Sequence, residues 1–170
     1  MLTGVVLLSA CASSQKQNDN EQERVYKQDK VIAEQARRNN KLYNQSAEKM
    51  YKTRQLPTIT YDFDSIRPPE YAYAFLDKVA QIMNLHENLH LVVEGHADIV
   101  GTDEYNYWIS SARASAMKSY LVSRGIRADR IHIYSYGADR PLTLDNSFAG
   151  RKTNRRVEFK FTTREWNSVY

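Results

Sequence analysis

The feature that most constrains the fold is the run from Leu89 to Arg113, where a strand pattern gives way to a helix pattern across a short polar loop. Its apolar residues predict a strand ending at Gly95. Asp98 falls in the loop, while Asn106 and Arg113 are seven residues apart and share one face of the following helix. An acid, an amide and a guanidinium therefore surround one concavity. Such a site suits a small zwitterion that offers an ammonium to Asp98 and a carboxylate to Arg113.

The remaining periodicity predicts one α/β domain over residues 57–163, followed by a short tail at 164–170. Strands are expected at 58–63, 89–94, 131–136 and 157–162, and helices at about 70–83 and 103–124. Gly125 stops the second helix, and residues 139–154 form a loop-rich excursion. The order β-α-β-α-β-β predicts a two-layer sandwich with the helices on one face of a mixed sheet.

Several sequence motifs over about residues 58–162 occur in the same order as in the OmpA-like peptidoglycan-binding domain family. The chain resembles this family, and most of all its lipoprotein branch. These segments are Phe63-Asp64, Leu76–Ala80, Val93–His96, Ser110 with Arg113-Ala114, Tyr120-Leu121, Gly125-Ile126, Tyr136-Gly137, Pro141, Asn146 and Asn154–Glu158. The resemblance implies that Asp98 and Arg113 clamp the meso-diaminopimelate of the peptidoglycan stem peptide. This chain departs from many members by having Ala97 instead of Thr and a compressed segment at residues 65–69.

Further candidates for the site flank this clamp. Asn106 either binds the ligand or bonds only within the loop, and both readings stay open. Thr102 is the expected N-cap of the second helix, and Gly101 permits a close approach of loop amides to a carboxylate. Phe63 and Asp64 end the first strand at the rim. Of Arg155 and Arg156, one is expected to face the ligand while the other pairs with an internal acid. An Asp98–Arg113 salt bridge is expected in the empty state.

Glu94, His96 and Asp98 alternate along one side of the strand, which raises the question of a metal ion. No cysteine or second nearby histidine completes a tetrahedral set, so we predict no metal site and a structural His96 bonded to backbone. Nucleophile arrangements and paired carboxylates are also missing from the pattern. We therefore expect a binding protein without a cofactor, and not an enzyme.

Cys11, the single cysteine, follows Leu8-Ser9-Ala10 in the pattern of a bacterial lipobox. Residues 1–10 are read as a lipoprotein signal peptide, although the usual positive n-region is missing, which a late start codon or a trimmed chain would explain. Ala12 after the acylated cysteine is associated with export to the outer membrane, where the domain would face the periplasm. Residues 11–56 then form a lipidated linker and, from about Val25, a polar helical tether with a thin apolar stripe.

The distribution of charged residues along the chain limits the classes of partner that are expected. Residues 1–55 hold ten Lys/Arg against six Asp/Glu, whereas residues 56–170 hold fourteen of each. The basic excess therefore belongs to the tether, and nucleic-acid binding loses its electrostatic argument. Two roles remain: a lipoprotein that ties the outer membrane to peptidoglycan with a Tol-type partner, or a wall-anchoring subunit of a larger envelope machine such as a flagellar motor or secretion system.

Overall fold

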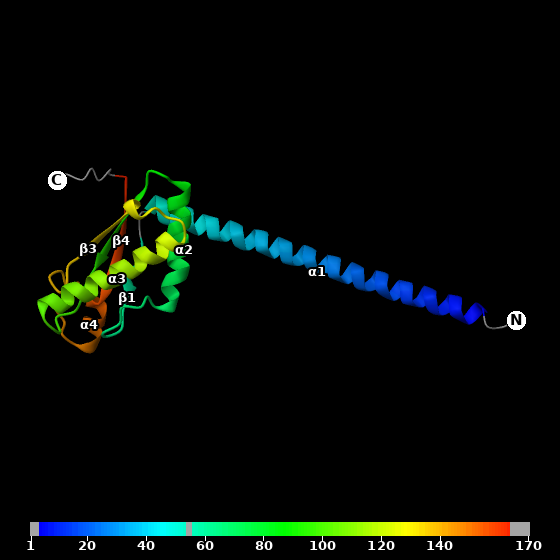
Figure 1. Ribbon diagram of the computed structural model, residues 1–170, viewed down its shortest axis with the longest axis horizontal. Coiled ribbons are helices and arrows are strands. Elements are labelled where there is room, and N and C mark those ends of the chain that lie inside the picture. Colours follow the sequence, from blue (N-terminus) through cyan, green and yellow to red (C-terminus); the bar gives the residue numbers. More distant parts are fainter. Residues whose placement is uncertain (1–3, 54–55, 164–170) are drawn as a thin grey trace. The chain divides into compact units, whose positions relative to one another are not determined.

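The computed structural model describes residues 4–53 and 56–163, and the side chains of these residues except 4–19 and 43. The chain divides into two compact units, Met1–Gln45 and Ser46–Tyr170. Helix α1 (Gly4–Thr53) supplies the first unit and the beginning of the second (Figure 1). The predicted tether helix is therefore present, and it also includes residues 12–24, which the sequence had indicated as a solvated linker.

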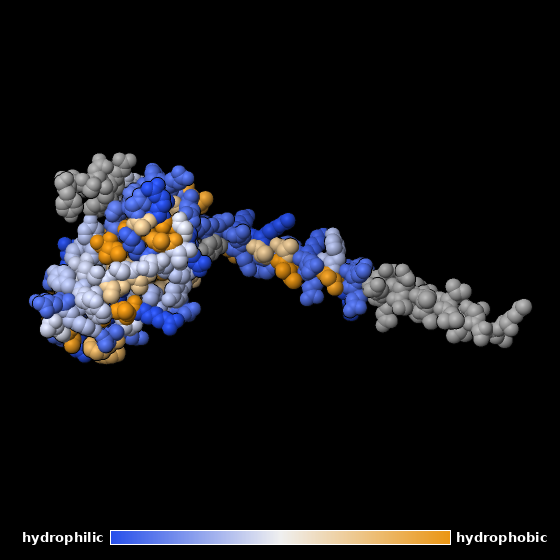
Figure 2. Space-filling view, in the orientation of Figure 1, coloured by the Kyte–Doolittle hydropathy of each residue, from blue (hydrophilic) through white to orange (hydrophobic). Residues whose placement is uncertain are grey.

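Helix α1 is long because no Gly or Pro interrupts residues 5–56. Ion pairs one turn apart add to it, each with the acid on the N-terminal side, which is the favourable order for the helix dipole: Glu23–Lys27, Glu34–Arg38 and Glu48–Lys52. Apolar side chains such as Val25 and Ile32 remain exposed on a mostly polar surface (Figure 2). Among the described residues, no helix is both long enough and apolar enough to cross a bilayer.

The second unit is built on a four-stranded mixed sheet, which confirms the predicted fold class. Its strands are β1 (Ile59–Thr60), β2 (His90–Gly95), β3 (Ile131–Ser135) and β4 (Arg156–Thr162), in the order β1-β4-β2-β3. Strands β2 and β3 are parallel, whereas β4 is antiparallel to both β1 and β2. The parallel pair requires a crossover connection, and the helix predicted after the 96–102 loop provides it.

Helices α2 (Glu70–Leu85) and α3 (Asp103–Ser123) cover one face of this sheet (Figure 1). Helix α2 was expected from the helical spacing of its apolar residues, and all of these are buried: Ala72, Phe75, Leu76, Val79, Ile82 and Met83. From the sheet, Leu91 and Val93 point into the same core, and Phe159 meets Phe75 edge to face at 5.0 Å between ring centroids. The end of α1 joins this core through Ala47, which is 2% exposed.

Two short elements were not predicted. The 3-10 helix η1 (Ala128–Arg130) leads into β3, and α4 (Phe148–Asn154) lies in the segment that the sequence indicated as loop. Helix α4 has only seven residues, too few for a periodic apolar pattern. Its clearest signal is local, since the Ser147 hydroxyl accepts a hydrogen bond from the Gly150 amide as an N-cap.

Gly95 allows α3 to approach β2. A Cβ at this position would lie 2.1 Å from the Ser110 carbonyl oxygen, a backbone atom that cannot rotate away. We expect Gly95→Ala to lower the free energy of unfolding by roughly 3 kcal/mol, measured by urea denaturation. Gly125→Ala is the control: its φ is +88° with open space around it, so the cost should be about 1 kcal/mol. A Gly95→Ala domain as stable as the parent would refute the close-packing argument.

Candidate functional site

Six of the eight predicted ligand-binding residues line one small pocket at the N-terminal end of α3. The lining consists of Phe63, Asp64, Ala97, Asp98, Val100, Tyr105, Asn106, Ile109, Arg113 and Arg155. It draws on the loop after β1, the loop after β2, one face of α3 and the residue that precedes β4. The cavity volume is only about 20 Å³, room for about one water molecule, so a ligand must open it at the rim.

Asp98 is 4% exposed and uses both carboxylate oxygens. Oδ2 accepts from Arg155 Nη1 at 2.6 Å, and Oδ1 accepts from the Val100 amide at 2.9 Å. The expected Asp98–Arg113 salt bridge is therefore wrong, because Arg155 takes that place. Arg155 crosses from the start of β4 and also donates from Nε to the Tyr61 carbonyl at 3.2 Å. Asp98 thus joins the end of β2 to β4.

Arg113 is 1% exposed, and its guanidinium is held by carbonyl groups. Nε donates to the Ser65 carbonyl at 2.8 Å and Nη1 to the His96 carbonyl at 3.2 Å. Its Cζ lies 4.9 Å from the centroid of the Tyr61 ring. Burial lowers the pKa of Arg113 to about 10, so the side chain still carries its charge at neutral pH.

Both buried arginines have spare hydrogen-bonding capacity. Within the described part of the chain, Nη2 of Arg113 and Nη2 of Arg155 have no hydrogen-bond partner. The pocket thus holds two buried guanidinium groups and one buried carboxylate, that of Asp98. Unpaired buried donors on charged groups are costly. The arrangement therefore favours an added anion, above all a planar carboxylate that accepts two parallel hydrogen bonds.

The N-terminus of α3 has the predicted cap. The Thr102 hydroxyl accepts from the Tyr105 amide at 3.2 Å, and Gly101 adopts φ +106°. Neither residue lines the pocket, so both shape the loop that leads into α3. Asn106 is 3% exposed and lies in the pocket wall, which leaves its amide close to the two arginines.

The rim is formed by aromatic and acidic side chains. Phe63 is 64% exposed, and Asp64 adopts a left-handed backbone conformation with φ 57°. The Tyr105 hydroxyl donates to Asp64 Oδ1 and so joins α3 to the loop after β1. Because Tyr105 and Asp64 are both surface residues, their bond can open without unfolding the core.

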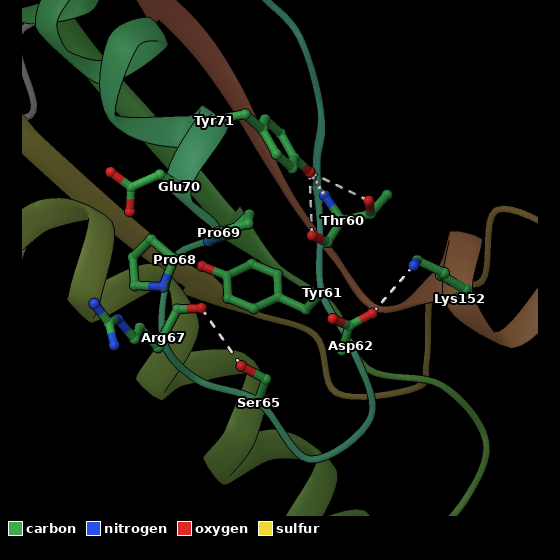
Figure 3. Close-up of a pocket in the computed structure, with 10 residues that line it drawn as sticks. All are labelled: Thr60, Tyr61, Asp62, Ser65, Arg67, Pro68, Pro69, Glu70, Tyr71 and Lys152. Atoms are coloured by element: carbon green, nitrogen blue, oxygen red, sulfur yellow. Dashed lines mark hydrogen bonds and ion pairs between the residues drawn. The ribbon is translucent and has the colours of Figure 1, made fainter.

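A second depression has a volume of about 460 Å³ (Figure 3). Its walls come from residues 60–62, 65 and 67–71, with Lys152 on α4 paired to Asp62 at 3.1 Å. The Tyr71 hydroxyl lies across the edge strand and bonds to the backbone of Thr60. Tyr61 and Ser65 belong to this wall and also contact Arg113, so the compressed loop after Asp64 separates the two hollows.

His96 differs from its prediction. No described residue bonds to either ring nitrogen, although the residue is 3% exposed, so the predicted backbone bond of a structural histidine is wrong. Burial, with Arg156 second, lowers the pKa of His96 to about 4. Arg156 pairs with Glu158 at 2.6 Å on the same side of the sheet. Both arginines of the 155–156 pair therefore bind internal acids, and only Arg155 also faces the pocket.

Comparison with known proteins identifies the family of this chain. The model of the OmpA family matches residues 60–155, more than half of the chain. The chain belongs to the OmpA family. Among curated relatives it is 39% identical over 99 residues to the peptidoglycan-associated lipoprotein of Rhizobium meliloti, covering 58% of this chain and 56% of that protein. It is 38% identical over 101 residues to outer membrane porin F of Pseudomonas aeruginosa, covering 59% of this chain but 29% of the porin.

Solved structures extend the likeness to three dimensions. The crystal structure of the peptidoglycan-associated lipoprotein from Burkholderia pseudomallei matches with a TM-score of 0.60 and 28% identity, covering 62% of this chain and 89% of that one. The C-terminal domain of Helicobacter pylori MotB matches with a TM-score of 0.59 at 22% identity, covering 65% and 88%, which shows a shared fold. Both of these solved structures therefore share the fold of this domain.

Sequence reasoning placed the candidate residues but missed how they pair. Arg155 lies 57 residues from Asp98, and no short-range pattern could connect them. The Ser65 and His96 carbonyls were missed as well, because backbone acceptors carry no side-chain signature. The only available hint was the adjacent Arg155-Arg156 pair at the start of a strand, where alternation sends the two side chains to opposite faces.

The lowered pKa of His96 predicts a specific acid sensitivity. As the pH falls below about 6.5, an unfolded chain protonates this histidine, whereas the folded domain does so only near pH 4. The contribution of His96 to the free energy of unfolding is thus constant above about pH 6.5, and it falls between pH 6.5 and 4 by up to about 3 kcal/mol. His96→Gln should remove this part of the pH dependence in urea unfolding at pH 7 and 4.5, whereas His86→Gln should keep it. The same change in unfolding free energy between the two pH values in the parent and in both variants would exclude His96 as the source.

Proposed function

We propose that this domain binds peptidoglycan noncovalently through the diaminopimelate-containing stem peptide. The observation that carries the proposal is the pair of unpartnered Nη2 groups of Arg113 and Arg155 in a pocket with one buried carboxylate. A ligand carboxylate would accept from both groups and satisfy their unpaired donors. The names of the Rhizobium and Burkholderia relatives, both peptidoglycan-associated lipoproteins, point to the same polymer.

The acid of the pocket supports a zwitterionic ligand and not a simple anion. Asp98 holds two hydrogen bonds, yet a carboxylate offers about four acceptor positions. An ammonium group of the ligand can therefore add to Asp98 while Arg155 stays in place. Diaminopimelate carries an ammonium and a carboxylate on one carbon, which fits an acid and two guanidinium groups within one small pocket. Asn106 in the wall offers an amide for the ligand backbone.

Ligand entry requires the rim to open, because the closed pocket holds only about 20 Å³. The Tyr105–Asp64 hydrogen bond bridges the entrance, and Phe63 lies beside it with most of its surface exposed. We propose that a stem peptide displaces this bond and covers the exposed ring.

We further propose that lipidated Cys11 anchors the chain to the outer membrane, with the domain facing the periplasm. Cys11 lies in α1, and its side chain is outside the described residues. About 35 helical residues separate it from Ser46, a reach of about 50 Å at 1.5 Å per residue. Each buried methylene of an acyl chain contributes about 0.8 kcal/mol to membrane binding. A Tol-type protein partner fits this role. Capture of a flagellar or secretion component from crosslinked envelopes would instead favour the alternative, a wall-anchoring subunit of a larger envelope machine.

Binding to purified sacculi should depend on the Arg113 fork. Arg113→Lys keeps the charge but cannot donate to Ser65, His96 and a ligand in one plane, so we expect affinity to fall about tenfold in co-sedimentation. Asp98→Asn should also weaken binding at least about tenfold, because it removes the charge that meets the ammonium. Arg127→Ala is the matched control, since that arginine is exposed and pairs with Asp129 away from the pocket.

Stability must be measured beside affinity, because Asp98 also pairs with buried Arg155. Breaking a buried ion pair costs about 3–5 kcal/mol, so Asp98→Asn should lower the melting temperature more than Arg113→Lys does. Binding is compared at a temperature where each variant is folded by circular dichroism. If folded Arg113→Lys and Asp98→Asn sediment with sacculi like the parent, the clamp assignment is wrong.

Membrane attachment should depend on Cys11. In a host with lipoprotein processing, and behind a complete signal peptide, Cys11→Ser should abolish incorporation of labelled palmitate and release the domain from the membrane fraction. Ser9→Thr, outside the acylated position, serves as the control. Unchanged membrane attachment of Cys11→Ser would show that another segment holds the protein at the membrane.

A further inference from the structure

A second cluster of polar side chains lies on the sheet face opposite the helices. Strand alternation sends Glu94 of β2 and Glu158 of β4 to this face, and the two residues are direct cross-strand partners. His96 follows β2 and places its Nε2 3.9 Å from Glu158 Oε1. One ligand atom from each of the three residues lies within 4.8 Å of the others. The cluster is separate from the pocket that holds Asp98 and Arg113.

The state of His96 is the observation that needs an explanation. The side chain is 97% buried, and both ring nitrogens are without a hydrogen-bond partner in the described part of the chain. Leaving such a group unsatisfied costs about 1–3 kcal/mol, and native proteins usually satisfy it with protein, water or an ion. A neutral imidazole offers one nitrogen lone pair, and this is the form that coordinates metals.

We propose that Glu94, His96 and Glu158 form a binding site for a divalent transition-metal ion, with Zn²⁺ as its best ligand. Imidazole nitrogen and carboxylate oxygen are both zinc ligands, and three protein ligands leave the fourth position of a tetrahedral site open. The sequence alone gave no third ligand, because Glu158 is 62 residues from His96. Only the pairing of β2 with β4 brings Glu158 near His96. Zinc–ligand distances near 2.1 Å require the donor atoms to draw in by about 1 Å, which the long glutamate side chains allow.

Two cations already neutralise the carboxylates, and they set the affinity. Lys160 Nζ lies 2.6 Å from Glu94 Oε2, but its side chain is 59% exposed, so a metal ion can displace it into solvent at small cost. Arg156 is buried and bonds to Glu158 Oε1 at 2.6 Å. We expect Arg156 to stay and to orient the carboxylate as a partner outside the coordination shell. Binding should therefore be in the micromolar range and should favour Zn²⁺ over Mg²⁺, which prefers oxygen ligands alone.

The test is calorimetric titration of the chelator-treated full chain with zinc chloride at pH 7, in a Cys11→Ser background so that the thiol does not contribute. We expect one saturable site, with affinity reduced at least about tenfold in Glu94→Gln and in His96→Gln. Lys160→Met removes the competing ammonium from an exposed position and should bind zinc about tenfold more tightly. Lys152→Met is the matched control, because that lysine is similarly exposed and pairs with Asp62 elsewhere.

The outcomes are decisive even if the buried His96 variant fails to fold. Failure of the parent to bind zinc, or equal affinities in Lys160→Met and Lys152→Met, would overturn the proposal. The other histidine pair, His90 and His132, has ring nitrogens 3.0 Å apart and is the obvious rival. His132→Gln should leave zinc affinity unchanged. Loss of zinc binding in this variant would place the site at His90 and His132 and not at His96. A zinc-free crystal structure with a water molecule bonded to His96 and unchanged on zinc soaking would also count against the site.

Discussion

The buried guanidinium of Arg113 is the interaction on which the rest of the site depends. A fully buried charge is tolerated only when its donors are matched, and the carbonyls of Ser65 and His96 match two of the three guanidinium nitrogens. This requirement fixes three segments at once: the loop after β1, the end of β2 and the middle of α3. The third nitrogen, Nη2, has no partner among the described residues and faces a pocket where a ligand could supply one.

The Asp98–Arg155 pair provides a second connection of the same kind, from the end of β2 to the start of β4. Buried ion pairs are poor sources of net stability, since desolvation offsets most of the attraction. Their value here lies in arrangement: both charges are held in place before a ligand arrives. Arg113 projects from α3, whereas Asp98 and Arg155 lie directly beside the ends of β2 and β4 and hold each other in place, so only the rim around Phe63 and Tyr105 has to move.

The two faces of one sheet have distinct roles in this domain. Leu91 and Val93 turn toward the helices and build the apolar core, while Glu94 and Glu158 turn to the opposite face. His96 belongs to both regions, because its carbonyl accepts from Arg113 whereas its ring lies beside Glu158. A one-residue shift in the register of β2 would exchange these faces, so the core and both polar sites depend on the same strand pairing.

The sequence by itself determined the elements whose patterns are long and regular. The apolar face of α2, the strand before Gly95 and the cap at Thr102 were all readable, because each depends on neighbours within a few residues. Helix α4 was not, since a seven-residue helix has no period to detect. Only the tertiary structure decided that Asp98 pairs with Arg155, that Arg113 binds carbonyls and that Glu158 stands beside His96. Apart from the bond between Arg113 and the His96 carbonyl, those contacts join residues 48 to 62 positions apart. Which of them form is set by strand order and packing, which no local pattern encodes.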